Sequence, residues 1–322
     1  MIAAGVDIGG SFIKAGLVDT ANGRIKARCS VPFPKGQGEE AVWDLVDASV
    51  KKLLRSQKMD PADLGFVGVA LPGTLSPDKT TVIHAYNLNF HGTLVYRPLQ
   101  ERFPHTPLAV MNDGDAATVA EHQFGVLKGA RTAVLLTLGT GVGGGLILNG
   151  KLFGGGLGNG VEPGHMTLRY DGEPHICGNN GCVEMYCGAH GLATEKPEAT
   201  PREIIEGIRR GSPESEKVLD RYTDALSSAL VSIVNLLDPE VIALGGGISN
   251  AGAPLIDMTA RKVREKSFFV AERRIVRASM GNDAGMVGAA VAGARQSAIG
   301  AGAKDATAEK ENGTMPQGGI RL

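Results

Sequence analysis

Short apolar runs that end in clusters of glycine are the feature of this sequence that most restricts its fold. Three such runs end in Gly9-Gly10, in Gly139-Thr140-Gly141 and in Gly245-Gly246-Gly247. Glycine supplies 46 of the 322 residues, about twice its usual share of about 7%. Because the glycines follow no three-residue period, the chain is not collagen-like. Glycine at the end of a strand lets the backbone approach a ligand closely, so these clusters predict binding turns.

Strands and helices alternate along the sequence. Phe66–Leu71 and Leu108–Met111 are short apolar runs typical of buried strands, whereas Val42–Leu54 and Glu214–Leu237 repeat apolar residues at helical spacing. A further helix is expected over 284–298. At 322 residues the chain is about twice as long as a typical domain of about 150 residues. These patterns predict an α/β protein of two lobes with a ligand site between them.

The charge balance excludes some classes of partner. The chain has 33 basic and 34 acidic residues, a formal net charge of −1 and no basic stripe. We therefore expect neither nucleic acid nor an anionic membrane surface as a partner. The first ten residues carry no basic region and no long apolar core, and no run approaches the roughly 18 apolar residues of a membrane span. The expected location is the cytoplasm.

The first glycine cluster lies in the turn of an expected β-hairpin. Gly9, Gly10 and Ser11 form this turn, with Asp7 before it and Lys14 after it. The backbone N–H groups of such a turn converge on one point, which suits a phosphate group. A carboxylate at the end of the strand, here Asp7, suits a hydrated Mg²⁺ ion. An ordinary tight turn with an exposed aspartate is the alternative.

The second cluster also lies between two apolar runs. Residues 139–144 satisfy the pattern G-x-G-x-x-G, but a strand (146–148) and an Asn149-Gly150 turn follow instead of a helix. This context excludes a Rossmann dinucleotide site, and the sequence has no P-loop pattern. Gly139, Thr140 and Gly141 are therefore interpreted as a second phosphate-binding hairpin. Gly245-Gly246-Gly247 would allow a nucleotide base or ribose to approach the backbone, and a flexible loop is the alternative.

An Asn112-Asp113 pair stands at the end of an apolar run and before an expected helix over 116–124. A carboxylate in this place is suited to act as a general base toward a bound hydroxyl group, with Asn112 orienting the substrate. An N-terminal helix cap is the alternative for such a pair. We expect Asp115 to cap the helix, which leaves Asp113 free.

Two histidines and two cysteines form the pattern H-x9-H-x-C-x4-C, with residues His165, His175, Cys177 and Cys182. Two imidazoles and two thiolates are a typical ligand set for structural Zn²⁺. Free cysteines beside surface histidines are the alternative. Glu162 and Glu184 flank this segment, and their carboxylates are suited to bind a ligand rich in hydroxyl groups.

Taken in order, these motifs resemble those of the ROK family (repressor, open reading frame, kinase) of sugar kinases, over residues 1 to about 298. The matching stretches are Asp7-Ile8-Gly9-Gly10-Ser11, Pro72-Gly73, Asn112-Asp113, Gly139-Thr140-Gly141-Val142-Gly143, Glu162-Pro163-Gly164-His165, Cys177-Gly178-Asn179-Asn180-Gly181-Cys182-Val183-Glu184 and Gly245-Gly246-Gly247. The resemblance implies a two-lobed actin-like ATPase fold with ribonuclease H-like lobes, in which ATP and sugar meet in the cleft between the lobes.

The resemblance also implies roles for individual residues. Asp113 would be the catalytic base. The residues implied to contact sugar hydroxyls are Asn112, Asp113, Glu162, His165 and Glu184. The implied zinc ligands are His165, His175, Cys177 and Cys182, although the family usually has cysteine at the position of His175. The residues expected at the nucleotide, its phosphates and Mg²⁺ are Asp7, Gly9, Gly10, Ser11, Lys14, Gly139, Thr140, Gly141, Gly245, Gly246 and Gly247. Two further departures are Met111-Asn112-Asp113-Gly114-Asp115 in place of E-N-D-A-N, and Pro163 in place of an aliphatic residue.

We expect a glucokinase-like hexokinase that transfers a phosphoryl group from ATP to O6 of a hexose. N-acetylated hexosamine, fructose or allose is the alternative acceptor, and polyphosphate remains open as a donor. A non-catalytic sugar-binding regulator is the alternative of another class, against which the presence of Asp113 argues. A repressor would need a DNA-binding domain before Asp7, where the sequence has six residues.

The expected organisation is a smaller lobe of residues 1–112 plus about 284–298, a larger lobe of 113–283 with a zinc-binding insert, and a flexible tail over 299–322. The resemblance suggests a homodimer or a homotetramer.

Overall fold

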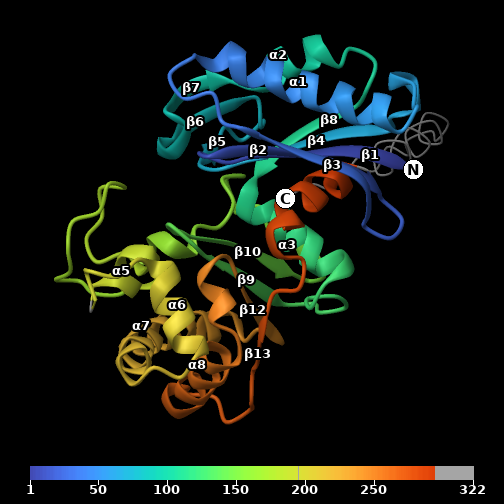
Figure 1. Cartoon of the computed structure of the whole chain (residues 1–322). Helices are drawn as coiled ribbons and strands as arrows, with labels where there is room; N and C mark the ends of the chain where they lie inside the picture. Colours follow the sequence, from blue (N-terminus) through green and yellow to red (C-terminus); the bar gives the residue numbers. More distant parts are fainter. Residues whose placement is uncertain (195, 294–322) are drawn as a thin grey trace, which may run out of the picture.

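The computed structural model of the chain describes residues 1–194 and 196–293, and it shows two lobes that each contain a five-stranded sheet (Figure 1). The strand order in the first lobe is β3-β2-β1-β4-β8. These strands are β1 (Ile2–Ile8), β2 (Phe12–Asp19), β3 (Arg24–Pro32), β4 (Phe66–Leu71) and β8 (Leu108–Asn112). β1 pairs antiparallel with β2 and parallel with β4, and β4 pairs parallel with β8. The first expected hairpin is therefore present.

Helices α1 (Glu39–Ser56) and α2 (Tyr96–Arg102) cover the outer face of this sheet (Figure 1). α1 buries one face, including the fully buried Trp43, against the sheet because its apolar residues recur at helical spacing. A small sheet of order β5-β6-β7 lies at the left-hand side of the first lobe in Figure 1. Its strands are β5 (Thr74–Leu75), β6 (Thr81–Ala85) and β7 (Phe90–Leu94).

The second lobe has the strand order β11-β10-β9-β12-β13. Its strands are β9 (Ala133–Leu138), β10 (Val142–Leu148), β11 (Lys151–Leu152), β12 (Val241–Gly245) and β13 (Arg274–Arg277). Its helices are α4 (Val183–Cys187), α5 (Ala189–Ala193), α6 (Pro201–Arg209), α7 (Pro213–Leu237) and α8 (Ala253–Lys266). The long helix expected over 214–237 is α7, and an apolar core joins it to α8 and to the sheet.

Two helices lie between the sheets (Figure 1). Helix α3 (Asp113–Phe124) follows the last strand of the first sheet but packs on β9 and β10 of the second. Residues 284–293 are helical and pack on the first sheet, where a Cβ at Gly5 or Gly68 would overlap their backbone. The chain therefore crosses between the lobes twice, once into α3 and once into the helix of residues 284–293. Residues 294–298 of the expected helix and the expected tail (299–322) lie outside the described residues.

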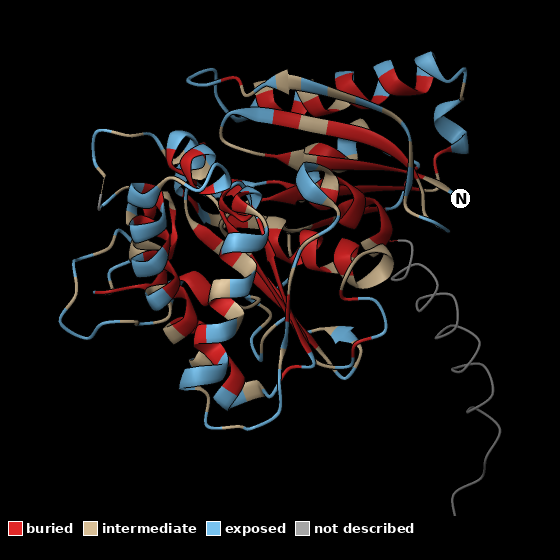
Figure 2. Cartoon of the chain, turned by 60° about the horizontal axis from the view of Figure 1, so that its bottom comes forward, coloured by how far each residue is buried: buried red, intermediate tan, exposed pale blue. Residues whose placement is uncertain are grey.

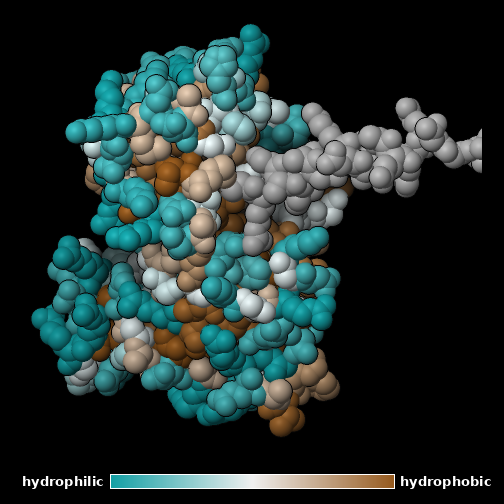
Figure 3. Space-filling view, turned by 90° about the vertical axis from the view of Figure 1, so that its right-hand side faces the viewer, coloured by the Kyte–Doolittle hydropathy of each residue, from teal (hydrophilic) through white to brown (hydrophobic). Residues whose placement is uncertain are grey.

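The burial pattern agrees with this arrangement. The central strands β1, β4, β9 and β12 are mostly buried, whereas the edge strand β3 is exposed or half-buried along its whole length. The helices have buried and exposed stripes (Figure 2). On the face shown in Figure 3, hydrophilic residues cover most of the surface and hydrophobic residues gather in small groups on both lobes. Within the described residues, no helix combines the length and the apolar character that a membrane crossing requires.

Candidate active site

Asp113 lies at the point where β8 ends and α3 begins. The side chain of Asn112 caps this helix, because its Oδ1 accepts hydrogen bonds from the amides of Gly114 (2.7 Å) and Asp115 (3.2 Å). Asn112 also donates from Nδ2 to the carbonyl oxygen of Gly73 at 3.1 Å. The expectation that Asp115 caps the helix was therefore wrong. The helix already begins at Asp113, and Asn112, whose backbone is extended, is the residue placed to cap it.

Two cavities meet at Asp113. A cavity of about 520 Å³ contains the side chains predicted to bind sugar, and a cavity of about 330 Å³ contains Asp7 and Lys14. Both are lined by Asp113, Thr137 and Gly246. A carboxylate at this junction is in reach of a ligand in each cavity, which is the placement that a group-transfer base requires.

The protein surroundings of the Asp113 carboxyl group stabilise its protonated, neutral form relative to the same group in water. Burial and the negative charge of Asp7 raise the pKa of Asp113 to about 6, while the hydrogen bond from the Gly114 amide opposes the shift. The Gly114 N–H donates to Oδ1 of Asp113 at 2.9 Å and so fixes one carboxylate oxygen. A base with a pKa near 6 is ionised at neutral pH and still accepts a proton readily.

The larger cavity is formed by both lobes. The predicted sugar-binding residues that line it are Asn112, Asp113, Glu162, His165 and Glu184. The first lobe contributes the Pro72-Gly73 turn and the side chains of His84 and Tyr86, whose rings stack with centroids 6.0 Å apart. No motif in the sequence identified His84 or Tyr86, because they reach the cavity only through the folding of the small sheet, His84 on β6 and Tyr86 in the 3-10 turn that follows it.

Three carboxylates, of Asp113, Glu162 and Glu184, line this cavity, and the carboxylate of Asp115 lies close enough for its charge to act on Glu162. The pKa of Glu162 is raised to about 7, first by burial of its carboxyl group and then by the charges of Asp113, Asp115 and Glu184. Burial also raises the pKa of Asp115 to about 6, against the opposing charge of Lys79. Oδ1 of Asp115 is buried without a hydrogen-bond partner. Such a cluster suits a ligand that supplies several hydroxyl donors.

The smaller cavity contains an acidic and a basic side chain that contact each other. Asp7 accepts a hydrogen bond from Lys14, with Nζ and Oδ2 3.2 Å apart, and Lys14 also donates to the carbonyl oxygen of Asn282 at 3.3 Å. A Cβ at Gly285 would lie 3.0 Å from Cγ of Asp7, so the helix that contains Gly285 approaches this carboxylate closely. Gly245 and Gly246 line the same cavity.

The predicted glycine turns divide between the cavities. Gly139, Thr140 and Gly141 line the cavity of about 520 Å³. Gly139 and Thr140 also line a third cavity, of about 900 Å³, together with Gly247. Gly246 has φ +78° and a Cβ there would overlap Leu138, so glycine is required. The turn of Gly9, Gly10 and Ser11 lines none of these three cavities.

The third cavity contains basic side chains that the motif analysis missed. They are Arg202 and Arg209 on α6 and Arg277 at the end of β13. Arg277 lines the smaller cavity as well, so it lies between the two spaces. These arginines lie far from Gly139 and Thr140 in the sequence, so no short motif could have linked them to the cavity.

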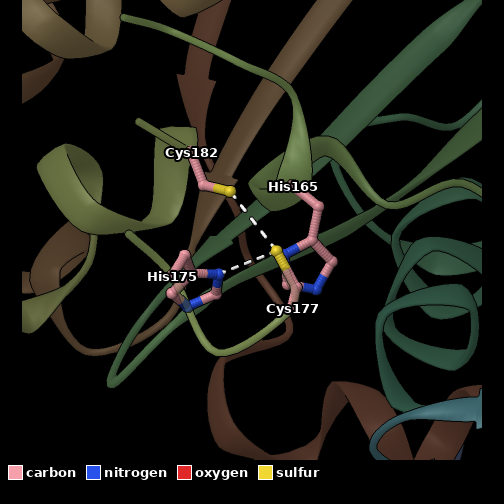
Figure 4. A group of neighbouring side chains, drawn as sticks. All are labelled: His165, His175, Cys177 and Cys182. Carbon is pink, nitrogen blue, oxygen red and sulfur yellow. Dashed lines mark hydrogen bonds between the residues drawn. The ribbon is translucent and has the colours of Figure 1, made fainter. Parts of the chain in front are cut away.

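The two histidines and two cysteines of the H-x9-H-x-C-x4-C pattern lie together (Figure 4). One possible ligand atom from each of His165, His175, Cys177 and Cys182 lies within 4.8 Å of all the others. Sγ of Cys177 is 3.0 Å from Nδ1 of His175 and 3.4 Å from Sγ of Cys182. Burial and the neighbouring Cys177 raise the pKa of the Cys182 thiol to about 11.

Comparisons with known proteins agree with this arrangement. A family model described as "ROK family" matches residues 3–295. The chain belongs to the ROK family. The match spans both five-stranded sheets and the His/Cys cluster, and the fold is the two-lobed actin-like ATPase fold of ROK sugar kinases.

ROK proteins similar to this chain include enzymes and solved structures. A glucokinase of Halalkalibacterium halodurans is 31% identical over 308 residues, which cover 88% of this chain and 92% of that protein. An N-acetylmannosamine kinase of Haemophilus influenzae is 30% identical, with 88% of this chain and 93% of that protein covered. The crystal structure of a ROK glucokinase from Streptomyces griseus, in complex with glucose and AMPPNP, has a TM-score of 0.80 and 29% identity over 92% of this chain and 100% of that one.

Proposed function

We propose that the cleft transfers the γ-phosphoryl group of ATP to a hexose, at the O6 hydroxyl group. The observation that carries this proposal is the position of Asp113 at the junction of two cavities, one lined by Glu162 and Glu184 and the other by Asp7 and Lys14. Membership of the ROK family and the coverage by glucokinase relatives make the protein an ATP-dependent sugar kinase. The identity of the sugar and the roles of single residues are the finer part of the proposal.

In the proposed mechanism, Asp113 accepts the proton of the attacking sugar hydroxyl. Its pKa of about 6 leaves it ionised at neutral pH. Asn112 holds the first turn of α3 in place, and Glu162 and Glu184 accept hydrogen bonds from other sugar hydroxyls. Phosphoryl transfer proceeds through a loose transition state, so the residues act mainly by positioning and by balancing charge.

Asp7 and Lys14 would serve the phosphates. Asp7 and Asp113 are close enough for the charge of one to raise the pKa of the other, which is the environment that a divalent cation neutralises. Two carboxylates supply the hard oxygen ligands that Mg²⁺ prefers, so Asp7 fits as its anchor. When bound, Mg²⁺ would neutralise charge that develops on the β- and γ-phosphates.

We place the nucleoside of ATP in the cavity of about 900 Å³. Gly139, Thr140 and Gly247 allow close approach to its wall, and Arg277 connects it with the phosphate cavity. In this arrangement the phosphates extend toward Asp113, and the sugar enters from the opposite side. Closure of the two lobes, taken as residues 1–112 plus 284–298 and residues 113–283, would exclude water from the transfer.

The His/Cys cluster fits a structural Zn²⁺ ion. Two imidazoles and two thiols are a complete tetrahedral donor set, and their ligand atoms already lie within 4.8 Å of one another. A bound ion would fix the segment that carries Glu162, His165 and Glu184. This segment otherwise has little regular structure between β11 and α4.

A coupled assay of ADP release tests the proposal directly. The panel contains glucose, mannose, fructose, allose, N-acetylglucosamine and N-acetylmannosamine, with ATP and polyphosphate as alternative donors. We expect ATP-dependent turnover with at least one hexose and phosphate at O6 of the product, as determined by NMR. Absence of turnover with every acceptor, with sugar binding retained, would favour a sugar-binding regulator. Preference for an N-acetylated hexosamine would agree with the N-acetylmannosamine kinase relatives.

A further inference from the structure

The two ring nitrogens of His175 make different contacts. Nδ1 lies 3.0 Å from Sγ of Cys177, inside the cluster of four possible metal ligands. Nε2 lies 3.0 Å from Oε1 of Glu184, and the His175 side chain is only 8% exposed. Figure 4 shows one nitrogen of this ring directed toward the sulfur of Cys177. His175 therefore connects the metal cluster with a carboxylate of the sugar cavity.

The other oxygen of Glu184 is also held. Oε2 accepts a hydrogen bond from the Val142 amide at 2.8 Å. A Cβ at Gly141 would overlap this carboxylate, so the turn between β9 and β10 leaves it no room to move in that direction. Together, Val142 and His175 fix both oxygens of Glu184. The rotation of a carboxylate held at both oxygens is defined, whereas one contact alone would leave it free to turn.

We propose that His175 is a positioning residue for Glu184, which binds the metal through Nδ1 and donates its Nε2–H to Oε1 of that carboxylate. The inference rests on the proposed function, in which Glu184 contacts the sugar. Ligation through Nδ1 leaves the ring proton on Nε2, which is the tautomer that Glu184 requires. A cysteine at this position could bind the metal but would have no second polar atom for Glu184.

The proposal separates two roles that one residue performs. Loss of the metal ligand would loosen the whole segment, whereas loss of the Nε2–H would release only Glu184. His175→Cys removes the second role and retains the first. We expect this variant to keep one zinc per chain by elemental analysis and to bind the hexose about tenfold more weakly in calorimetry without nucleotide, the usual effect of losing a hydrogen bond to a charged group. KM for the hexose should rise while kcat changes little.

A double-mutant cycle tests whether His175 acts through Glu184. If it does, His175→Cys adds nothing to the loss of hexose affinity caused by Glu184→Ala. Additive losses in the double variant, or wild-type hexose affinity in a zinc-loaded His175→Cys variant, would overturn the proposal. His175→Gln is the complementary variant, because its amide can donate to Glu184 but is a poor zinc ligand. We expect it to lose zinc.

A measurement on the wild-type protein makes the contact testable apart from the kinase activity. Long-range ¹H–¹⁵N NMR of the zinc-loaded protein should show His175 protonated at Nε2 and metal-bound at Nδ1. The reverse tautomer would overturn the proposal even where hexoses are phosphorylated. If no hexose in the panel is phosphorylated, the proposed function fails, and the tautomer still decides the His175–Glu184 contact.

Discussion

The two five-stranded sheets have the same connectivity. In each sheet three consecutive antiparallel strands are followed by two parallel strands. The strands β1, β2, β3, β4 and β8 therefore correspond to β9, β10, β11, β12 and β13. The registers correspond as well. Asp7 pairs with Lys14 one position before the first turn, and Thr137 pairs with Gly143 at the same place before the second. Equivalent backbone positions therefore carry an ion pair in one lobe and no charge in the other.

The lobes also differ in what is inserted between equivalent strands. In the first lobe, β3 and β4 are separated mainly by α1. In the second, β11 and β12 are separated by residues 153–240, which include Glu162, Glu184, the His/Cys cluster and helices α4 to α7. The comparison indicates a division of work in the proposed kinase. The first lobe provides the Asp7–Lys14 ion pair at the cavity of about 330 Å³, and the insertion provides Glu162, His165 and Glu184 at the cavity of about 520 Å³.

The largest effect is expected at Asp113, which follows β8. The residue after the equivalent strand, β13, is not acidic. Asp113→Asn should lower kcat by about 10²- to 10⁴-fold, because the proton acceptor is lost. Hexose affinity should remain roughly intact, since an amide oxygen still accepts a hydrogen bond. Steady-state kinetics and calorimetry measure the two effects.

Asp115→Asn is the matched control for that substitution. Both carboxylates lie in the first turn of α3 and both have a pKa raised to about 6, but only Asp113 lines the two cavities. The control should therefore keep most of its turnover. More than a tenth of wild-type turnover in Asp113→Asn would remove Asp113 from the role of base.

The next effect compares the equivalent positions of the two hairpins. Asp7→Asn should raise KM for Mg-ATP about 10- to 100-fold, because it removes one charged contact. Thr137→Val should have a smaller effect, since its position supplies no charge. Similar losses in the two variants would show that the hairpins contribute equally and would contradict the division of work.

The pH dependence of kcat/KM examines the same pair of carboxylates. The ionised form of Asp113 is active, so kcat/KM should fall about tenfold per pH unit below its pKa of about 6. The charge of Asp7 helps to raise this pKa. In Asp7→Asn the acidic limb should therefore move to lower pH. An acidic limb that stays in place would mean that another group controls it.

The sequence was sufficient where chemistry requires particular residue types at close spacing. The glycine turns predicted both hairpins, because strands that reverse over a few residues leave little choice of conformation. The His/Cys pattern predicted residues that do lie together, since ligand types and spacing are restricted by the geometry of a metal site.

What the sequence did not predict depends on contacts between distant segments. The equivalence of the two sheets was invisible because backbone pairing accepts many side chains, so their sequences share little beyond the glycine turns. The contact between His175 and Glu184 and the place of Arg277 between two cavities arise only when separate loops meet. The cap of α3 was misassigned because both Asn112 and Asp115 are good capping residues, and only the end of β8 decides between them.

The smallest expected effect concerns stability and the orphan carboxylate oxygen of Asp115. Burial raises the pKa of Asp115 from 3.8 to about 6, so the folded state holds its proton more tightly than the unfolded state does. The stability associated with that proton is complete below about pH 4 and is lost as the pH rises through about 6. Asp115→Asn removes the buried charge and should raise the free energy of unfolding by about 1–3 kcal/mol at pH 8. This gain in stability should disappear near pH 4. Urea denaturation of the variant and the wild-type protein at pH 4 and pH 8 measures it. A variant less stable than wild type at pH 8 would show that the ionised carboxylate has a stabilising partner.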